Sequence, residues 1–301
     1  MTRSPVLFLV FNRPDFTAAS AQAIIRNRPS KLYVACDGPR DPAEAEVVAA
    51  TQRAVVSAAD GAVEVATLFR DRNLGCKRAV EEGISWFLSH ESEGIIIEDD
   101  CIPSASFFEF CDEMLERYRD EPRVMHISGY CHEPGDGGYR FSQFPAVWGW
   151  ATWRRAWAHY PEDLPAMTSS HRRALRAAFT SNEERDYFVQ RWDQVSKGHL
   201  DTWDFSWSYA LLSRQGLAVQ PSRNLVRNIG VGDARAAHTT RPKPSVTENR
   251  QCEIDVTNLD EPALLLADYE HDRNFFRTMI AGRLARVRSA VRRLRAWRPR
   301  E

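Results

Sequence analysis

The sequence lacks the marks of a membrane-spanning or secreted protein. No stretch approaches the ~18 consecutive apolar residues that a membrane span needs, and the apolar run at residues 6–11 is too short for the core of a signal peptide. Polar residues follow that run at once, beginning with Asn12. These absences predict a cytoplasmic protein, or one that contacts the inner face of a membrane only from the side.

Cysteine is sparse and unpatterned. The six cysteines include no Cys-x-x-Cys pair and no histidine at zinc-site spacing, which predicts free thiols in a reducing compartment. The net charge of −1 gives no reason to expect a nucleic-acid partner. Neither G-x-G-x-x-G nor G-x-x-x-x-G-K-[ST] occurs, which argues against a Rossmann oxidoreductase and a P-loop NTPase.

Short apolar runs alternate with helical periodicity through the first hundred residues. Strands are expected at residues 5–11, 32–36, 63–69 and 94–97, and helices at 15–25, 42–59 and 74–88. This alternation predicts an α/β fold with a mostly parallel central sheet flanked by helices. Later in the chain we expect a strand at 124–127 and helices at 107–118, 169–178, 183–196 and 203–214.

Polar residues gather where the four early strands end. In parallel sheets, ligands bind outside the carboxyl ends of the strands, so these side chains are expected to meet at one edge. The residues concerned are Asn12 and Arg13, Asp37, Arg72 and Asn73, and the acidic triplet Glu98, Asp99 and Asp100.

The acidic triplet follows the apolar run Ile95, Ile96 and Ile97. Three adjacent carboxylates repel one another, and a hard divalent cation such as Mg²⁺ or Mn²⁺ would relieve that repulsion. Alternatively, the acids precede a helix and would stabilise its N-terminus. The sequence favours the cation and leaves the helix cap open.

With its neighbours, the triplet resembles the DXD-like acidic motif of GT-A-fold glycosyltransferases, nearest to the N-acetylglucosaminyltransferase I-like and bacterial family 2-like groups. The segment from Ile95 to Phe110 carries most of the resemblance. It continues, in order, over roughly residues 5–240 through Phe11-Asn-Arg-Pro14, Cys36-Asp-Gly38, Trp148-Gly-Trp150, Trp203-Asp204, Asn228-Ile-Gly-Val-Gly-Asp233 and His238-Thr239.

The resemblance implies a role for each matching residue. Arg13 and Asp37 would lie near the nucleotide, Glu98 near the donor sugar, and Asp99 near the ribose or the water shell of the metal. Asp100 would ligate Mn²⁺ or Mg²⁺, and His238 would complete the metal site unless it is a surface histidine. Further donor contacts are expected from Asn12, Arg72, Asn73, Gly149 and Trp150, and from Lys77 unless it is a solvated helix charge.

A sugar acceptor needs a base to remove the proton of its attacking hydroxyl. The candidates are Asp204 and Asp201, and the relatives place the base just after a tryptophan, which favours Asp204. Asp201 also suits the N-cap of a helix that begins at residue 203.

The resemblance therefore implies a metal-dependent hexosyl- or N-acetylhexosaminyltransferase, inverting, that uses a UDP-sugar. Its acceptor would be a glycan or lipid-linked, as in bacterial polysaccharide biosynthesis. A sugar-nucleotide pyrophosphorylase is an alternative, but the first strand lacks the Gly-rich basic loop that such an enzyme uses. A non-catalytic carbohydrate- or nucleotide-binding module is another, and the intact acidic triplet argues against it.

We expect a catalytic domain at residues 1–270, with a nucleotide-binding half at about 1–102 and an acceptor half at about 103–270. Residues 271–301 follow as a basic amphipathic helix, with apolar residues spaced by three or four and many arginines. Such a helix suits an anionic membrane surface, so residues 275–301 are a candidate for peripheral membrane contact. Docking on its own domain or on another subunit is the alternative.

Overall fold

The computed structural model describes residues 2–131, 134–135, 137–235 and 250–281. Its centre is an eight-stranded mixed sheet in the order β3-β2-β1-β4-β8-β6-β9-β7, and β10 and β5 form a second, two-stranded sheet. The strands are β1 (Val6–Val10), β2 (Leu32–Cys36), β3 (Val65–Phe69), β4 (Glu93–Glu98), β5 (Cys101–Pro103), β6 (Val124–Ser128), β7 (Tyr139–Ser142), β8 (Trp150–Trp153), β9 (Leu217–Pro221) and β10 (Val226–Asn228).

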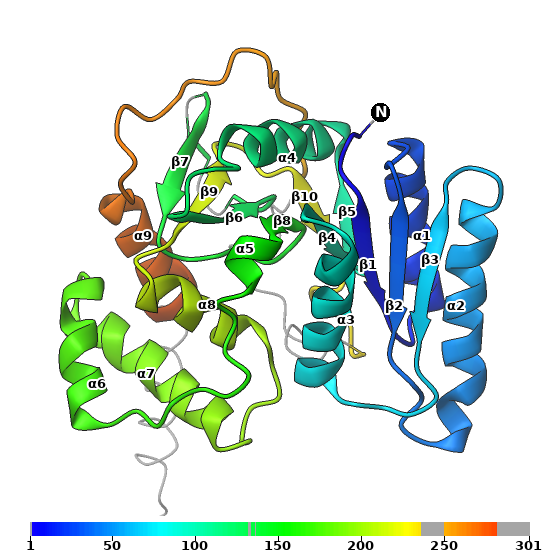
Figure 1. Ribbon diagram of the computed structural model, residues 1–301, viewed down its shortest axis with the longest axis horizontal. Coiled ribbons are helices and arrows are strands. Elements are labelled where there is room, and N and C mark those ends of the chain that lie inside the picture. Colours follow the sequence, from blue (N-terminus) through cyan, green and yellow to red (C-terminus); the bar gives the residue numbers. More distant parts are fainter. Residues whose placement is uncertain (1, 132–133, 136, 236–249, 282–301) are drawn as a thin grey trace, which may run out of the picture.

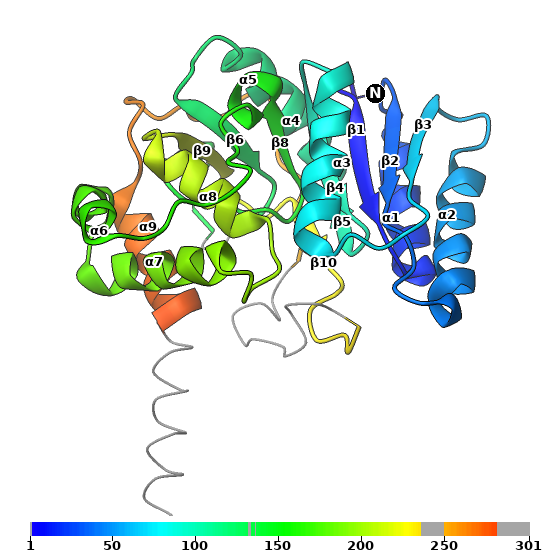
Figure 2. The ribbon, with the colours of Figure 1, turned by 60° about the horizontal axis from the view of Figure 1, so that its bottom comes forward.

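Helices flank both faces of the sheet (Figures 1 and 2). The α-helices are α1 (Pro14–Arg26), α2 (Ala45–Ala59), α3 (Cys76–His90), α4 (Ala105–Arg117), α5 (Arg154–Trp157), α6 (Ser169–Ala174), α7 (Asn182–Ser196), α8 (Asp204–Ser213) and α9 (Tyr269–Phe275). Two 3₁₀ turns, η1 (Pro42–Glu44) and η2 (Leu175–Ala178), and a π-helical turn, η3 (Phe276–Ala281), complete them.

Strands β3, β2, β1 and β4 run parallel, as the alternating pattern predicted. The chain first moves from β1 outward to β3 and then returns to β4 on the other side of β1. Because such crossovers are right-handed, α1 and α2 cover one face of these strands and α3 covers the other (Figure 1). The expected α/β fold, with a largely parallel central sheet between helices, is confirmed.

The other half of the sheet differs from the sequence expectation. Strand β8 runs antiparallel to β4 and β6, and β7 runs antiparallel to β9. The sequence did not predict β5, β7, β8, β9 or β10. These strands are short and find their partners far along the chain, so local periodicity carries little sign of them.

Two apolar cores hold the molecule together. The larger lies between the sheet and helices α1–α5, and the fully buried strand residues of β1, β2 and β4 belong to it. The smaller joins α7 and α8 to Phe144, Leu164 and Met167. The expected C-terminal helix begins at Tyr269, and its first turns pack against this body, with Phe276 only 3% exposed. Residues 282–301 of that predicted helix lie outside the described part of the chain.

Candidate active site

The carboxyl ends of the parallel strands border a cavity of about 520 Å³, a volume suited to a small-molecule ligand. Strand register brings the ends together, because Leu9 lies opposite both Ala35 and Glu98, and Cys36 lies opposite Phe69. Nine residues expected at the site line this cavity: Asn12, Arg13, Asp37, Asn73, Glu98, Asp99, Asp100, Asp201 and Asp204.

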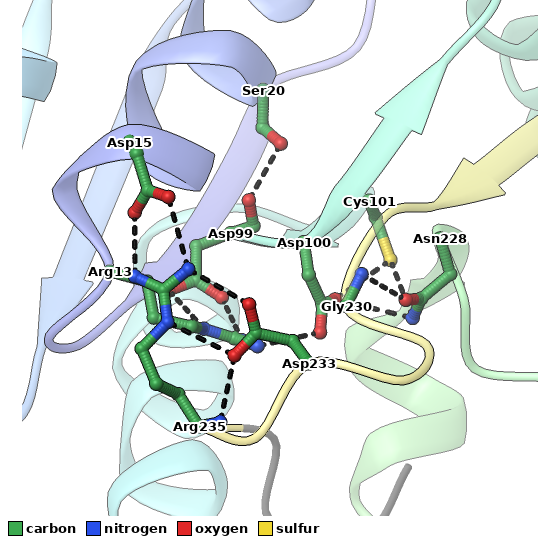
Figure 3. A network of polar contacts seen from close by, with 10 residues as sticks. All are labelled: Arg13, Asp15, Ser20, Asp99, Asp100, Cys101, Asn228, Gly230, Asp233 and Arg235. Atoms are coloured by element: carbon green, nitrogen blue, oxygen red, sulfur yellow. Dashed lines mark hydrogen bonds and ion pairs between the residues drawn. The ribbon is translucent and has the colours of Figure 1, made fainter. Parts of the chain in front are cut away.

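The acidic triplet forms the deepest polar part of the wall. Glu98 ends β4, while Asp99 and Asp100 occupy the following turn with 3% and 6% of their surface exposed. The guanidinium of Arg13 donates to both carboxylates, and its Nη1 lies 3.0 Å from Asp100 Oδ2 (Figure 3). Ser20 Oγ donates to the backbone oxygen of Asp99 at 2.7 Å, which fixes the turn against α1.

Burial dominates the electrostatics of these acids. It raises the pKa of Glu98 to about 8, with the charges of Asp100 and Asp99 adding to the shift. Burial also raises the pKa of Asp99 to about 6, against the opposing effect of Arg13. With all three carboxylates ionised, one guanidinium leaves two negative charges in a poorly solvated place, so the residues fit a bound divalent cation.

That Asp100 holds such a cation stays a prediction, and in this structure its Oδ2 accepts from Arg13 and its Oδ1 lies 3.3 Å from Asn228 Nδ2. Within the described ranges, no three His, Cys, Asp or Glu side chains are grouped so that they could hold a metal ion. Mg²⁺ and Mn²⁺ can take most of their ligands from water and phosphate oxygens, so the predicted site would rest on few protein groups. His238, the other expected ligand, lies outside the described residues.

The alternative that the triplet caps the next helix does not hold. Strand β5 separates the triplet from α4, and Ser104 is the N-cap of that helix, with its Oγ accepting from Phe107 N at 3.2 Å. Glu253 adds a second cap by accepting from Ala105 N and Ser106 N. The N-terminus of α4 is therefore capped by Ser104 and Glu253 and not by the acidic triplet.

The ends of β2 and β3 contribute a carboxylate, Asp37, and an amide, Asn73, to the cavity wall. Asp37 accepts from the backbone N–H groups of Gly38, Leu74 and Gly75 at 3.0–3.2 Å, and burial raises its pKa. Asn73 Nδ2 donates to the Gly38 oxygen at 2.8 Å, and Asn12 Nδ2 donates to Glu44 Oε1 at 2.6 Å. The backbone after β2 and the turn after β3 are therefore joined by hydrogen bonds from Asp37 and Asn73.

Arg72 and Lys77 do not line the cavity, contrary to the sequence expectation. Arg72 is exposed, and Lys77 Nζ contacts Glu81 Oε2 at 3.2 Å and the Glu162 backbone oxygen at 3.3 Å. Arg70 lines the wall instead, and its Nη1 is buried without a hydrogen-bond partner in the described structure. Arg70 could have been predicted from the sequence, because it directly follows Phe69, the last residue of β3.

The two candidate bases have different surroundings. Asp204 Oδ1 accepts from Thr202 Oγ1 and from Phe205 N, the latter at 2.9 Å, at the start of α8. Asp201 accepts from Cys76 N and Lys77 N, each at 2.9 Å. Asp201 therefore caps α3, and the expectation that it caps the helix beginning near residue 203 is corrected.

The tryptophan expected to line the site is buried instead. Trp150 is 1% exposed and stacks between His126, at 4.9 Å, and Trp203, at 5.4 Å between ring centroids. Neither Trp150 nor Gly149 belongs to the cavity wall, and Trp148 takes that place. Trp148 is half-buried and meets Tyr130 edge-on at 4.7 Å.

A late segment closes the cavity beside the triplet. Asn228 Nδ2 lies 3.3 Å from Asp100 Oδ1, and Ile229 N donates to the Asp100 backbone oxygen at 2.7 Å. Arg235 also lines the cavity and pairs with Asp15 and Asp233 (Figure 3). Residues far apart in the sequence thus enclose the acids from both sides.

Comparison with known proteins gives likeness only at the level of structure. The sequence matches no family model and no curated protein. A mannosyltransferase from Pyrobaculum calidifontis, in complex with GDP-Man and Mn²⁺, is 11% identical over 69% of this chain and 70% of its own, with a TM-score of 0.40. A UDP-glucose pyrophosphorylase is 6% identical over 76% and 94%, with a TM-score of 0.40.

A third similar structure is mouse xyloside xylosyltransferase 1, which is 10% identical over 71% of this chain and 82% of its own, with a TM-score of 0.33. The structures that this chain resembles therefore include glycosyltransferases and a nucleotidyltransferase. Identities and scores this low leave the reaction to be argued from the site itself.

Proposed function

We propose that this chain is a GT-A-type glycosyltransferase that moves a hexosyl or N-acetylhexosaminyl group from a UDP-sugar to a glycan or lipid-linked acceptor. One observation carries the proposal. The buried acids Asp99 and Asp100 share a single cavity with Asp204, which belongs to a different element. A transferase needs this combination, because one group of charges stabilises the leaving diphosphate and a separate carboxylate removes the proton of the acceptor hydroxyl.

The chain's own residues suggest how the donor is held. Asp37 and Asn73 form the wall at the ends of β2 and β3, which suits the nucleotide. Arg13 and Arg235 bring guanidinium groups to the same cavity, which suits the phosphates. A divalent cation bound at Asp100 would neutralise charge that develops on the leaving diphosphate.

Asp204 is the proposed base. Its Oδ1 is held by Thr202 and Phe205, while its Oδ2 has no hydrogen bond in the described part of the chain and is available to an acceptor hydroxyl. As the acceptor oxygen bonds to the anomeric carbon, its proton passes to Asp204. The bond from that carbon to the diphosphate breaks at the same time, which releases the nucleoside diphosphate and inverts the anomeric centre.

A sugar-nucleotide pyrophosphorylase remains the competing enzyme. Such an enzyme uses a Gly-rich basic loop after its first strand, whereas here Arg13 and Pro14 lead directly into α1. The two reactions also differ in their second substrate, because the pyrophosphorylase needs pyrophosphate or a nucleoside triphosphate.

The decisive experiment is a thermal-shift panel of nucleotides, nucleotide-sugars and pyrophosphate, each with and without Mn²⁺, on wild type and Asp100→Ala. A ligand that binds only the folded state stabilises it by roughly 2.7 kcal/mol at a hundred times Kd. We expect a Mn²⁺-dependent shift with a UDP-sugar that is lost in Asp100→Ala and kept in Asp60→Ala, whose exposed side chain lies at the end of α2. No shift with any nucleotide would contradict the transferase and support a carbohydrate-binding module, and a pyrophosphate-dependent shift would support the pyrophosphorylase.

A further inference from the structure

The turn that leads from β3 into α3 is held by two carboxylates from distant parts of the chain. Asp37, at the end of β2, accepts from the N–H groups of Leu74 and Gly75. Asp201, from the segment before α8, accepts from the N–H groups of Cys76 and Lys77 at 2.9 Å each. Of the four successive backbone N–H groups at residues 74–77, the first two are bound by Asp37 and the last two by Asp201. Asp201 belongs to the same segment as Asp204.

Gly75 makes this arrangement sterically feasible. Its φ of +85° lies in the region that favours glycine, and a Cβ at this position would come within 2.9 Å of Asp201 Oδ2. The 15-residue helix α3 then begins with its first N–H groups facing a carboxylate, which its dipole also favours. The chain itself thus occupies the N-terminus of α3.

Asp201 is connected to Asp204 through two residues, Thr202 and Trp203. Thr202 is 5% exposed and its Oγ1 donates to Asp204 Oδ1. Trp203 is 3% exposed and stacks on Trp150, while its backbone oxygen accepts from Tyr160 Oη at 3.4 Å. Thr202 and Trp203 are held by burial, and the hydrogen bonds of Asp201 join the start of this segment to the N-terminus of α3.

We propose that Asp201 is a positioning residue that sets the place of the Asp204 carboxylate relative to the donor. Both oxygens of Asp201 are engaged by backbone donors, which argues against the alternative that Asp201 is itself the base. Because Asp37 holds the other half of the same turn, the donor wall and Asp204 share one rigid support. This inference rests on the proposed transferase function and adds a role that the reaction alone does not require.

The test compares Asp201→Asn with Asp201→Ala in steady-state transfer. Asn has nearly the shape of Asp and its amide oxygen can still accept from one of the two N–H groups, but it is not a base in the pH range of the assay. We expect Asp201→Ala to lower kcat about 10- to 100-fold, as a misplacement of about 1 Å does, with the donor KM changed less than about threefold. Asp201→Asn should be clearly more active than Asp201→Ala and should keep the pH profile of kcat/KM.

Thr202→Val supplies a second variant, because it removes the hydrogen bond to Asp204 while keeping the shape of the side chain. It should lower kcat in the same way as Asp201→Ala. If Asp201→Asn is as inactive as Asp201→Ala, or if Asp201→Ala is as active as wild type, the positioning role is wrong. Failure of the proposed function looks different, because wild type itself would then show no transfer and no nucleotide-dependent thermal shift.

Discussion

At the scale of single residues, the close contact between Gly230 and Asp100 leaves no room for a larger side chain at position 230. Gly230 packs so tightly on Asp100 that a Cβ would overlap the Oδ2 atom, and the Gly230 N–H donates to Asn228 Oδ1 at 2.8 Å. The same Asn228 contacts Asp100 through its Nδ2. The position of the proposed cation ligand therefore depends on a glycine in a segment 130 residues further along the chain.

Gly230→Ala should displace the Asp100 carboxylate and weaken Mn²⁺-dependent nucleotide binding by about tenfold or more, because the ligand loses its set position. The measurement is the Mn²⁺-dependent thermal shift, with titration of the nucleotide. Gly61→Ala is the control, since Gly61 has a φ of +66° with no atom within 4 Å of a Cβ. It should cost stability from backbone strain and leave binding intact. Equal binding by both variants would contradict the steric argument.

At the scale of elements, α9 is joined to the sheet by a buried carboxylate. Asp272 is 1% exposed, and it accepts from Ser142 Oγ at 2.5 Å and from Gln143 N at 3.0 Å at the end of β7. Burial raises its pKa to about 7, and the neighbouring charges of Glu184 and Asp268 act in the same direction. The folded protein therefore holds the Asp272 proton more tightly than the unfolded chain.

Since the folded pKa is raised, the contribution of Asp272 to stability is lost as pH rises from about 4 to about 7. Asp272→Asn removes this dependence, and an amide can still accept from Gln143 N while Ser142 Oγ turns to accept from it. We expect the free energy of unfolding of Asp272→Asn, relative to wild type, to improve by on the order of 2–4 kcal/mol across that range. Urea unfolding at a series of pH values measures this difference.

Ser142→Ala is the matched variant for that series. The Ser142 hydrogen bond lowers the pKa of Asp272, so its removal should extend the pH dependence to higher pH while the carboxyl group stays in place. A flat difference between Asp272→Asn and wild type over pH 4–7 would show that the carboxyl group titrates alike in the folded and unfolded states.

At the scale of the whole molecule, the C-terminal region divides into a part docked on the body and a basic part. His271, Asp272 and Phe276 of the first part are buried. Asp272 bonds to Ser142 of β7, and Phe276 meets Tyr187 of α7 edge-on. No helix in the described part of the chain is long and apolar enough to cross a bilayer. Membrane contact through residues 275–301 stays a prediction, and the docked residues show where a deletion has to begin.

Two truncations separate these parts. A chain that ends at Asp268 should be less stable than one that ends at Ala281 by at least about 2 kcal/mol, since burying one Phe side chain alone is worth about that much. The midpoint of urea unfolding measures the difference. Equal midpoints would mean that α9 and η3 contribute nothing to the fold.

The chain that ends at Ala281 also tests the membrane prediction without disturbing the docked residues. We expect the full chain to co-sediment with anionic phosphatidylserine vesicles and the truncated chain to do so several-fold less, because most of the arginines of the tail are removed. Unchanged co-sedimentation would rule out residues 282–301 as the contact.

By itself, the sequence determined the parallel half of the fold and the edge at which the cavity lies. Runs such as residues 6–10 and 95–97 are apolar on both faces, and only a strand covered by helices on both sides buries such a run. The residues that follow each run are then fixed at the same edge by strand register. This is why Asp37, Asp99 and Asp100 could be placed at the cavity from local pattern alone.

Tertiary structure decided what depends on partners far along the chain. Asp201 caps a helix that begins 125 residues earlier, and no spacing near Asp201 indicates which helix it meets. Trp150 is the first residue of β8 and is held in the core by pairing with β4 and β6, whereas Trp148 precedes the strand and lines the cavity. Gly149 lies between them with a φ of +62°, which interrupts the alternation that would place both side chains on one face. Local pattern records which residues are apolar or charged, whereas non-local pairing determines which way each side chain faces.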